Sequence, residues 1–405
     1  MNERVKRLRE ETLNAINTLS SERGVLITEF YKSIENVNLS VPVQRAMAFD
    51  YILTNKKIYI GEGELIVGER GPKPKATPTY PEICVHTQED LEVLDTRKNV
   101  SFKVDKQTRK DFRDIITPYW TGKNNRERIM QAMSPEWKQA FEAGIFTEFM
   151  EQRAPGHTVL DDKVYRKGMN AFRREIAAAL AALDFERDPE AVDRREQLKA
   201  MDVACESLVL FAERHAALAE ERAATETDEA RRAELRKIAD VCRRVPAEAP
   251  RDFHEALQMY WFCHLGVITE LNGWDAFSPG HLDQHLLPFY RKGLADGTLA
   301  EESARELLEC LFVKFNNHTS PPKVGVTAAE SGTYTDFANI NLGGLTRDGA
   351  DGSNAVTHLL LDVIDDFHLL QPSSNMQVSR KTPDAVLKHA LRVIRNGYEI
   401  GRAHV

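Results

Sequence analysis

The feature that most constrains this sequence is an apolar run of about fifteen residues, from Leu257 to Leu271. It contains Gln258, His264 and Glu270, and it falls short of the roughly 18–20 apolar residues that a membrane-spanning helix needs. The run therefore predicts a helix buried inside a soluble protein rather than a span.

Composition agrees with a soluble chain. Of its 405 residues, 42% are hydrophobic and 29% are charged, which is typical of globular proteins. The net charge of −8 argues against nucleic acid or an anionic membrane as a partner, since both favour a basic face. The first twelve residues, "MNERVKRLREET", carry no secretory signal. Five cysteines without a C-x-x-C pair fit a reduced, cytoplasmic protein.

The order of the expected elements predicts an α/β fold. Residues 1–56 and 162–245 have helical patterns, and further helices are expected near 253–271 and 300–316. Two β-rich runs at 58–60 and 65–67 predict a hairpin. The segments "SGTYTDFANINLGGL" and "QPSSNMQVSRK" each predict a loop that leads into a short strand. Polar loops at strand ends are where α/β enzymes usually hold their chemistry.

The stretch "NGWDAFSPGHLDQHLLPFY", residues 272–290, raises the question of a metal site. His281 and His285 are four residues apart, as in zinc motifs, but Leu282 occupies the place of the required glutamate and no third ligand follows. We therefore expect no metal. A helix that starts after Pro279 and carries Asp283 in its first turn is the favoured interpretation.

Three polar loops leave a structural and a functional interpretation open. Asp275 stands between Trp274 and Phe277, where a carboxylate needs either a structural partner or a cationic ligand. His157 follows a Pro-Gly turn, and the third loop carries Ser331, Thr333, Thr335 and Asp336. From the residues alone, a structural role is favoured for each loop.

These loops together resemble the glycyl radical enzyme superfamily. The motifs are "GERGPKPKATPTYPE", "RAPGHT", "NGWDAFSPGHLDQHLLPFY" and "SGTYTDFANINLGG", in this order, and the match runs to about Tyr398. S-P-G-x-x-D-Q at 278–284 is general to the superfamily, whereas the Trp-Asp pair and S-G-T-Y-T-D-F resemble the branch that dehydrates trans-4-hydroxy-L-proline.

The resemblance implies a ten-stranded barrel, built from two antiparallel five-strand halves and surrounded by helices. It implies a glycyl radical, installed by an activating enzyme that uses S-adenosylmethionine and an iron–sulfur cluster. The radical oxidises a cysteine to a thiyl, which takes a hydrogen atom from the substrate; water then leaves, giving 1-pyrroline-5-carboxylate. No other bound cofactor is implied, and a homodimer is expected.

Carried onto this chain, the implied substrate contacts are Phe149, His157, Asp275, Ser331, Asp336 and Phe337. Carboxylates suit the ring ammonium of hydroxyproline, and a hydroxyl or imidazole donor suits its carboxylate. Asp275 is a candidate for proton transfer to the leaving hydroxyl.

The motifs of the thiyl cysteine and the radical glycine do not occur in this sequence. We therefore expect residues 1–398 to be the N-terminal part of a pyruvate formate-lyase-like domain, inactive alone. Residues 399–405, "EIGRAHV", match the translation of a common sequencing adapter and are interpreted as non-native. Alternatives are another glycyl radical lyase (an arylacetate decarboxylase, a diol dehydratase or a choline-type lyase), a metal-dependent hydrolase and, least favoured, a helical scaffold.

Half a barrel would leave strand edges and apolar inner faces open. We therefore expect the 405-residue chain to aggregate or to stay partly unfolded at neutral pH. Calorimetry combined with light scattering checks this, and a sharp cooperative melt of a soluble monomer would count against the half-barrel interpretation.

Overall fold

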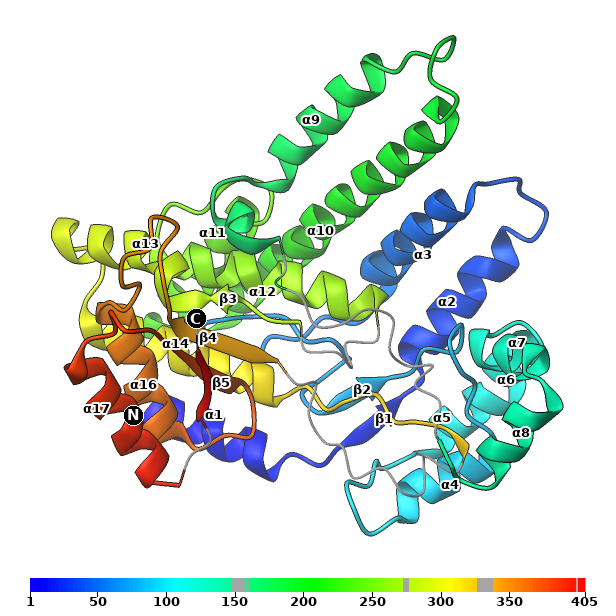
Figure 1. Cartoon of the computed structure of the whole chain (residues 1–405), viewed down its shortest axis with the longest axis horizontal. Helices are drawn as coiled ribbons and strands as arrows, with labels where there is room; N and C mark the ends of the chain where they lie inside the picture. Colours follow the sequence, from blue (N-terminus) through cyan, green and yellow to red (C-terminus); the bar gives the residue numbers. More distant parts are fainter. Residues whose placement is uncertain (147–157, 159, 272–276, 326–337, 398–399, 405) are drawn as a thin grey trace.

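The computed structural model describes residues 1–146, 158, 160–271, 277–325, 338–397 and 400–404. Helices dominate it, and two small parallel sheets lie among them (Figure 1). The expected α/β class is confirmed. The described strands form sheets of two and four members, so the ten-stranded barrel stays a prediction for a longer protein.

The helices follow one another along the chain from the N-terminus. They are α1 (Glu3–Asn14), α2 (Glu22–Ser33), α3 (Val41–Asn55), α4 (Gln88–Thr96), α5 (Lys106–Asp111), η1 (Phe112–Ile116), α6 (Thr117–Trp120), α7 (Asn125–Ala132), α8 (Pro135–Glu142), η2 (Asp161–Tyr165), α9 (Met169–Ala181), α10 (Ala191–Thr225), α11 (Glu229–Arg244), α12 (Phe253–Glu270), α13 (Leu282–Asp296), α14 (Glu301–Asn316), α16 (Ala355–Phe367) and α17 (Asp384–Arg395).

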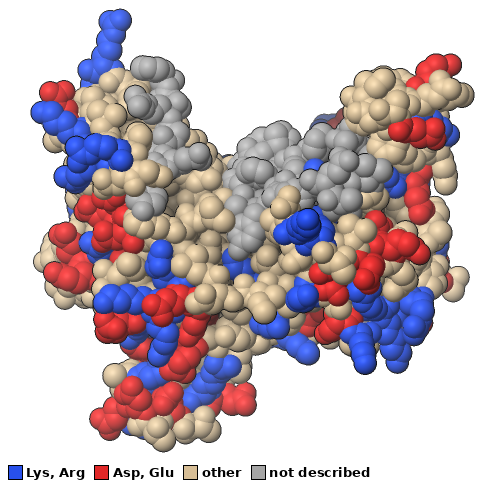
Figure 2. Space-filling model, turned by 90° about the horizontal axis from the view of Figure 1, so that it is seen from below, with Lys and Arg blue, Asp and Glu red and all other residues tan. Residues whose placement is uncertain are grey.

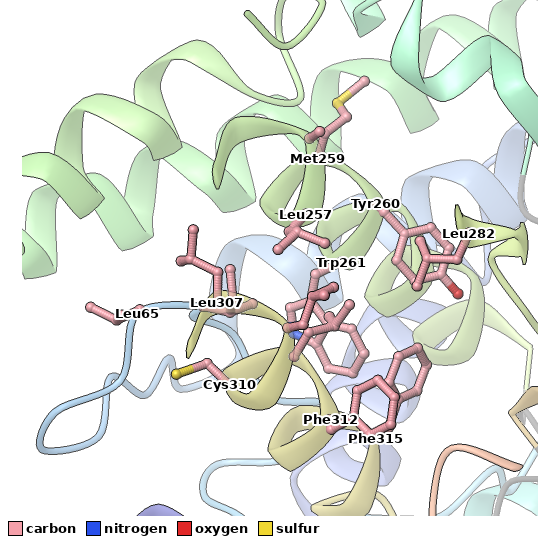
Figure 3. Packing of buried hydrophobic residues seen from close by; sticks show 14 of the residues in the cluster. Leu65, Leu257, Met259, Tyr260, Trp261, Leu282, Leu307, Cys310, Phe312 and Phe315 are labelled. Carbon is pink, nitrogen blue, oxygen red and sulfur yellow. The ribbon is translucent and has the colours of Figure 1, made fainter. Parts of the chain in front are cut away.

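Helices α12 and α14 form the centre of the larger hydrophobic core, and both were predicted within two residues of their bounds. Trp261 of α12 stacks with His264 and with His318, with ring centroids 5.1 Å apart in each pair, and Phe315 meets it edge-on. Figure 3 shows Trp261 and Tyr260 of α12 beside Phe312 and Phe315 of α14. Within the described residues, no helix is long and apolar enough to cross a membrane.

The hairpin predicted at 58–67 is wrong, because side chains replace the expected partner strand. The amide of Gln258 donates to the Val67 carbonyl and accepts from the Val67 N–H, both at 2.9 Å. The indole of Trp261 donates to the Gly68 carbonyl at 2.9 Å. Buried backbone groups need hydrogen-bond partners, but these partners need not belong to a strand. Side chains of α12 therefore fill this role for Val67 and Gly68, and the segment stays a loop.

A buried ion network holds the same loop against α14. The ammonium of Lys314 lies 2.5 Å from Glu64 and 2.9 Å from Glu69, and all three side chains are at most 5% exposed. Glu69 also accepts from the Asn317 amide at 2.8 Å and lies 3.2 Å from His318 Nε2. Burial would raise the pKa of Glu69, but Lys314 and His318 lower it to about 2. Burial raises the pKa of Glu64.

Helix α11 buries one face in the hydrophobic core. The helical spacing of Leu235, Ile238, Ala239 and Cys242 in the sequence predicts that they form its buried face, and all four are buried. The sequence also predicts Thr227 as the residue that caps this helix, and this is wrong by one residue, because the Asp228 side chain accepts from the Ala230 N–H. Charges of both signs are interspersed over the described surface in Figure 2.

Two parallel sheets complete the fold. Strands β1 (Thr18–Ser20) and β2 (Ala76–Pro78) pair in one, and β3 (Gly280–His281), β4 (Asn339–Gly343), β5 (Ser373–Val378) and β6 (Ile400–His404) follow one another in the other. The strands predicted in "SGTYTDFANINLGGL" and "QPSSNMQVSRK" are confirmed as β4 and β5. Strand β6 falls within the tail interpreted as non-native, and that interpretation stays a prediction.

Replacing Lys314 by methionine should lower the free energy of unfolding by about 3–5 kcal/mol, because two buried carboxylates lose their cation. Urea titration of the full-length protein at pH 7 measures the change. The control is Lys237→Met, whose half-exposed ammonium lies 3.2 Å from Asp252 and whose loss should cost less than about 1 kcal/mol. Equal losses in the two variants would contradict a structural role for the network.

Candidate functional site

The three polar loops are joined to one edge of the four-stranded sheet. Thr158 follows the first loop and forms a parallel bridge with Ser278, which follows the second. Gly280 of β3 then pairs with Ile340 of β4, the strand that follows the third loop. Because all these pairs are parallel, the amino ends of the strands lie at the same edge.

None of the six residues that the family resemblance implies falls within the described part of the chain. Phe149, His157, Asp275, Ser331, Asp336 and Phe337 all lie outside it. The structure does place residues that neighbour them in the sequence: Thr158 and Ser278 form a β-bridge, and Phe277 and Ala338 are buried. The structure therefore brings together the segments that directly follow the three loops, and the six assignments stay predictions.

Asp283 fixes the start of α13 against the carboxyl end of β4. It lies in the first turn of α13, as predicted, but its carboxylate has more partners than the helix terminus. It accepts from the Gly343 N–H of β4 at 2.7 Å, from the Thr357 hydroxyl of α16 at 2.5 Å and from the Gln284 N–H at 2.8 Å. Burial raises the pKa of Asp283 to about 6, although these donors act in the opposite direction.

Gln284 completes the contact between α13 and the end of β4. Its amide donates to the Gly343 carbonyl at 2.8 Å. Gly343 and Gly344 have φ values of +67° and +76°, and a Cβ added at Gly343 would lie 2.6 Å from the Met376 side chain. The D-Q pair and the two glycines thus form one structural unit that fixes β3 beside β4.

The two histidines that resemble a zinc pair have separate partners. His285 Nε2 lies 3.6 Å from Asp161, whereas His281 Nδ1 lies 3.4 Å from the Gln284 amide. Across the described ranges, no group of three or more His, Cys, Asp or Glu side chains is arranged to hold a metal ion. The geometry gives the metal-dependent hydrolase no support.

Sequence reasoning missed Asn339, the first residue of β4. Its Oδ1 atom is buried and accepts no hydrogen bond from the described part of the chain. The signal was the alternation in "NINLG", in which Ile340 and Leu342 are buried while Asn339 and Asn341 are half-buried. Such alternation indicates a strand with one apolar and one polar face.

The family model for pyruvate formate lyase-like proteins matches residues 1–402. The chain belongs to this family. It is 52% identical, over 396 residues, to trans-4-hydroxy-L-proline dehydratase from Clostridioides difficile, covering 98% of this chain and 50% of that protein. The chain spans about half the length of the curated relatives it matches.

Solved structures of the family share this fold. The crystal structure of hydroxyproline dehydratase from Clostridioides difficile with trans-4-hydroxy-L-proline bound has a TM-score of 0.94 and 51% identity, covering 98% of this chain and 50% of that one. A glycyl radical enzyme from Archaeoglobus fulgidus has a TM-score of 0.89 and 28% identity, covering 99% and 51%. The resemblance to glycyl radical enzymes, and to the hydroxyproline branch among them, is confirmed.

The pKa of Asp283 sets the sign of a pH effect. An acid whose pKa is higher in the folded protein binds more protons there, so its contribution to stability decreases as the pH rises through about 6. Relative to Asp283→Asn, the wild-type chain should therefore gain about 1 kcal/mol between pH 7 and pH 5. Urea titrations of the full-length protein at the two pH values measure this gain, and a difference that stays flat or reverses would contradict a raised pKa for the buried Asp283.

Proposed function

We propose that the full-length protein, of which this chain would form the N-terminal half, dehydrates trans-4-hydroxy-L-proline to 1-pyrroline-5-carboxylate. The observation that carries the proposal is the agreement over nearly the whole chain with a dehydratase solved with that substrate. Convergence of the three loop-bearing segments on one sheet edge supports a common site there.

The proposed site residues divide the substrate between them. Asp275 and Asp336 would bind the ring ammonium, and His157 and Ser331 would donate to the substrate carboxylate. Phe149 and Phe337 would pack against the ring. We assign proton transfer to Asp275, whose carboxylate would take a proton from the ring ammonium and pass it to the hydroxyl as it leaves as water.

The remaining parts of the proposal concern the longer protein. The thiyl cysteine and the radical glycine would lie downstream and would supply the hydrogen abstraction. We propose that residues 1–398 contribute to a ten-stranded barrel, and that residues 399–405 are non-native. A radical S-adenosylmethionine activating enzyme, a homodimer and a cytoplasmic location complete the proposal.

The activity is tested on the full-length protein under anaerobic conditions with its activating enzyme. We expect 1-pyrroline-5-carboxylate from trans-4-hydroxy-L-proline, and no comparable turnover of a diol, of choline or of an arylacetate. Efficient turnover of one of those substrates instead would assign the protein to another glycyl radical lyase. Absence of turnover despite a full glycyl radical signal, with all of these substrates, would overturn the proposal.

Two substitutions test the carboxylates. Asp275→Asn and Asp336→Asn should each lower kcat/KM for hydroxyproline at least about 100-fold, because each removes a charge opposite the ring ammonium. The control is Asp240→Asn on α11, whose side chain is 73% exposed. Glycyl radical content, measured by electron paramagnetic resonance, must match in all variants. Wild-type kcat/KM in both variants would contradict the assignment.

A further inference from the structure

Strands β4 and β5 present two different faces. On one face, Ile340 and Leu342 of β4 and Met376 of β5 belong to the hydrophobic core. The register places Leu342 beside Met376, so these side chains share that face. The intervening residues are polar and half-buried, and they point the other way. They are Asn339 and Asn341 of β4, and Asn375 and Gln377 of β5.

Asn339 differs from its neighbours on the polar face. Its Oδ1 is shielded from solvent yet lacks a donor within the described residues, whereas no buried unpartnered atom is found on Asn341, Asn375 or Gln377. A shielded acceptor without a donor destabilises the fold unless a donor reaches it in the working protein. Ser374 Oγ is also buried and unpartnered, but it lies on the Met376 face, toward the core.

The position of Asn339 indicates which donor could reach it. It opens β4 at the amino edge, two residues after Phe337, and Ile340 beside it pairs with Gly280 of β3. This is the edge at which the segments following all three loops meet. The proposed substrate has a secondary ring ammonium, which carries two N–H donors. A carboxylate can take one N–H and leave the other for a neutral acceptor.

We propose that Asn339 is a further substrate-binding residue, whose Oδ1 accepts a hydrogen bond from the ring ammonium of a cyclic amino acid. This inference rests on the proposed function and adds a specificity determinant to it. An amide oxygen at this place favours a cyclic ammonium over an uncharged diol, because a hydrogen bond from a charged N–H is stronger than one from a neutral hydroxyl.

The test uses the full-length protein loaded with its radical. Asn339→Leu keeps the approximate volume but removes the acceptor, so KM for hydroxyproline should rise about tenfold. Because the lost contact holds the substrate and not the reacting bond, kcat should change much less. Asn339→Asp restores the acceptor and should return KM close to the wild-type value.

A second measurement separates binding from catalysis. Calorimetry on the radical-free protein should show a Kd for hydroxyproline weakened by the same factor in Asn339→Leu. The matched control is Asn341→Leu, on the same strand and face but one pleat further from the edge, which should keep wild-type values. Asn339→Ala, with the same expected rise in KM, replaces the leucine variant if the latter does not fold.

The outcomes are distinguishable. If the wild type converts hydroxyproline but Asn339→Leu has an unchanged KM and Kd, or if Asn341→Leu weakens binding equally, the inference fails and the proposed function stands. If the wild type neither converts nor binds hydroxyproline, the proposed function fails and the inference falls with it.

Discussion

The interaction on which the fold depends is the burial of one lysine between two glutamates. Lys314 of α14 holds Glu64 and Glu69, which lie on a loop about 250 residues earlier in the chain. Charged groups away from water are costly unless each has partners, so the loop is stabilised in the position where the three side chains meet. That position lays the backbone of Val67 and Gly68 along α12, where side chains satisfy it.

Packed elements connect this buried network to the candidate site. Helix α12 ends at Glu270, directly before the second polar loop, and that loop leads to β3. The Asp283 carboxylate then accepts hydrogen bonds that link α13 to β4 and α16, and Gln284 adds a hydrogen bond from α13 to β4. Rigid elements therefore flank the loops on which the proposed substrate contacts lie. Such support is what a site needs if it is to hold a substrate in one orientation.

Residue periodicity predicted the helices and strands whose buried residues recur at regular spacing within a single segment of the chain. Helices α12 and α14, strands β4 and β5 and the buried face of α11 follow directly from residue spacing. The hairpin failed because β-rich residues at 58–67 indicate an extended backbone but do not specify its partner. Distant contacts, such as Lys314 with Glu69, leave no local pattern. The site residues came only from family resemblance, and they remain proposals.

We propose that hydroxyproline binds at the amino edge of the β3–β5 sheet. A crystal structure of the radical-free, full-length protein with trans-4-hydroxy-L-proline tests it most directly. We predict the ring ammonium within hydrogen-bonding distance of Asp275 or Asp336 and of Asn339, with the ring between Phe149 and Phe337. A ligand bound away from this edge, or held by none of these residues, would contradict it.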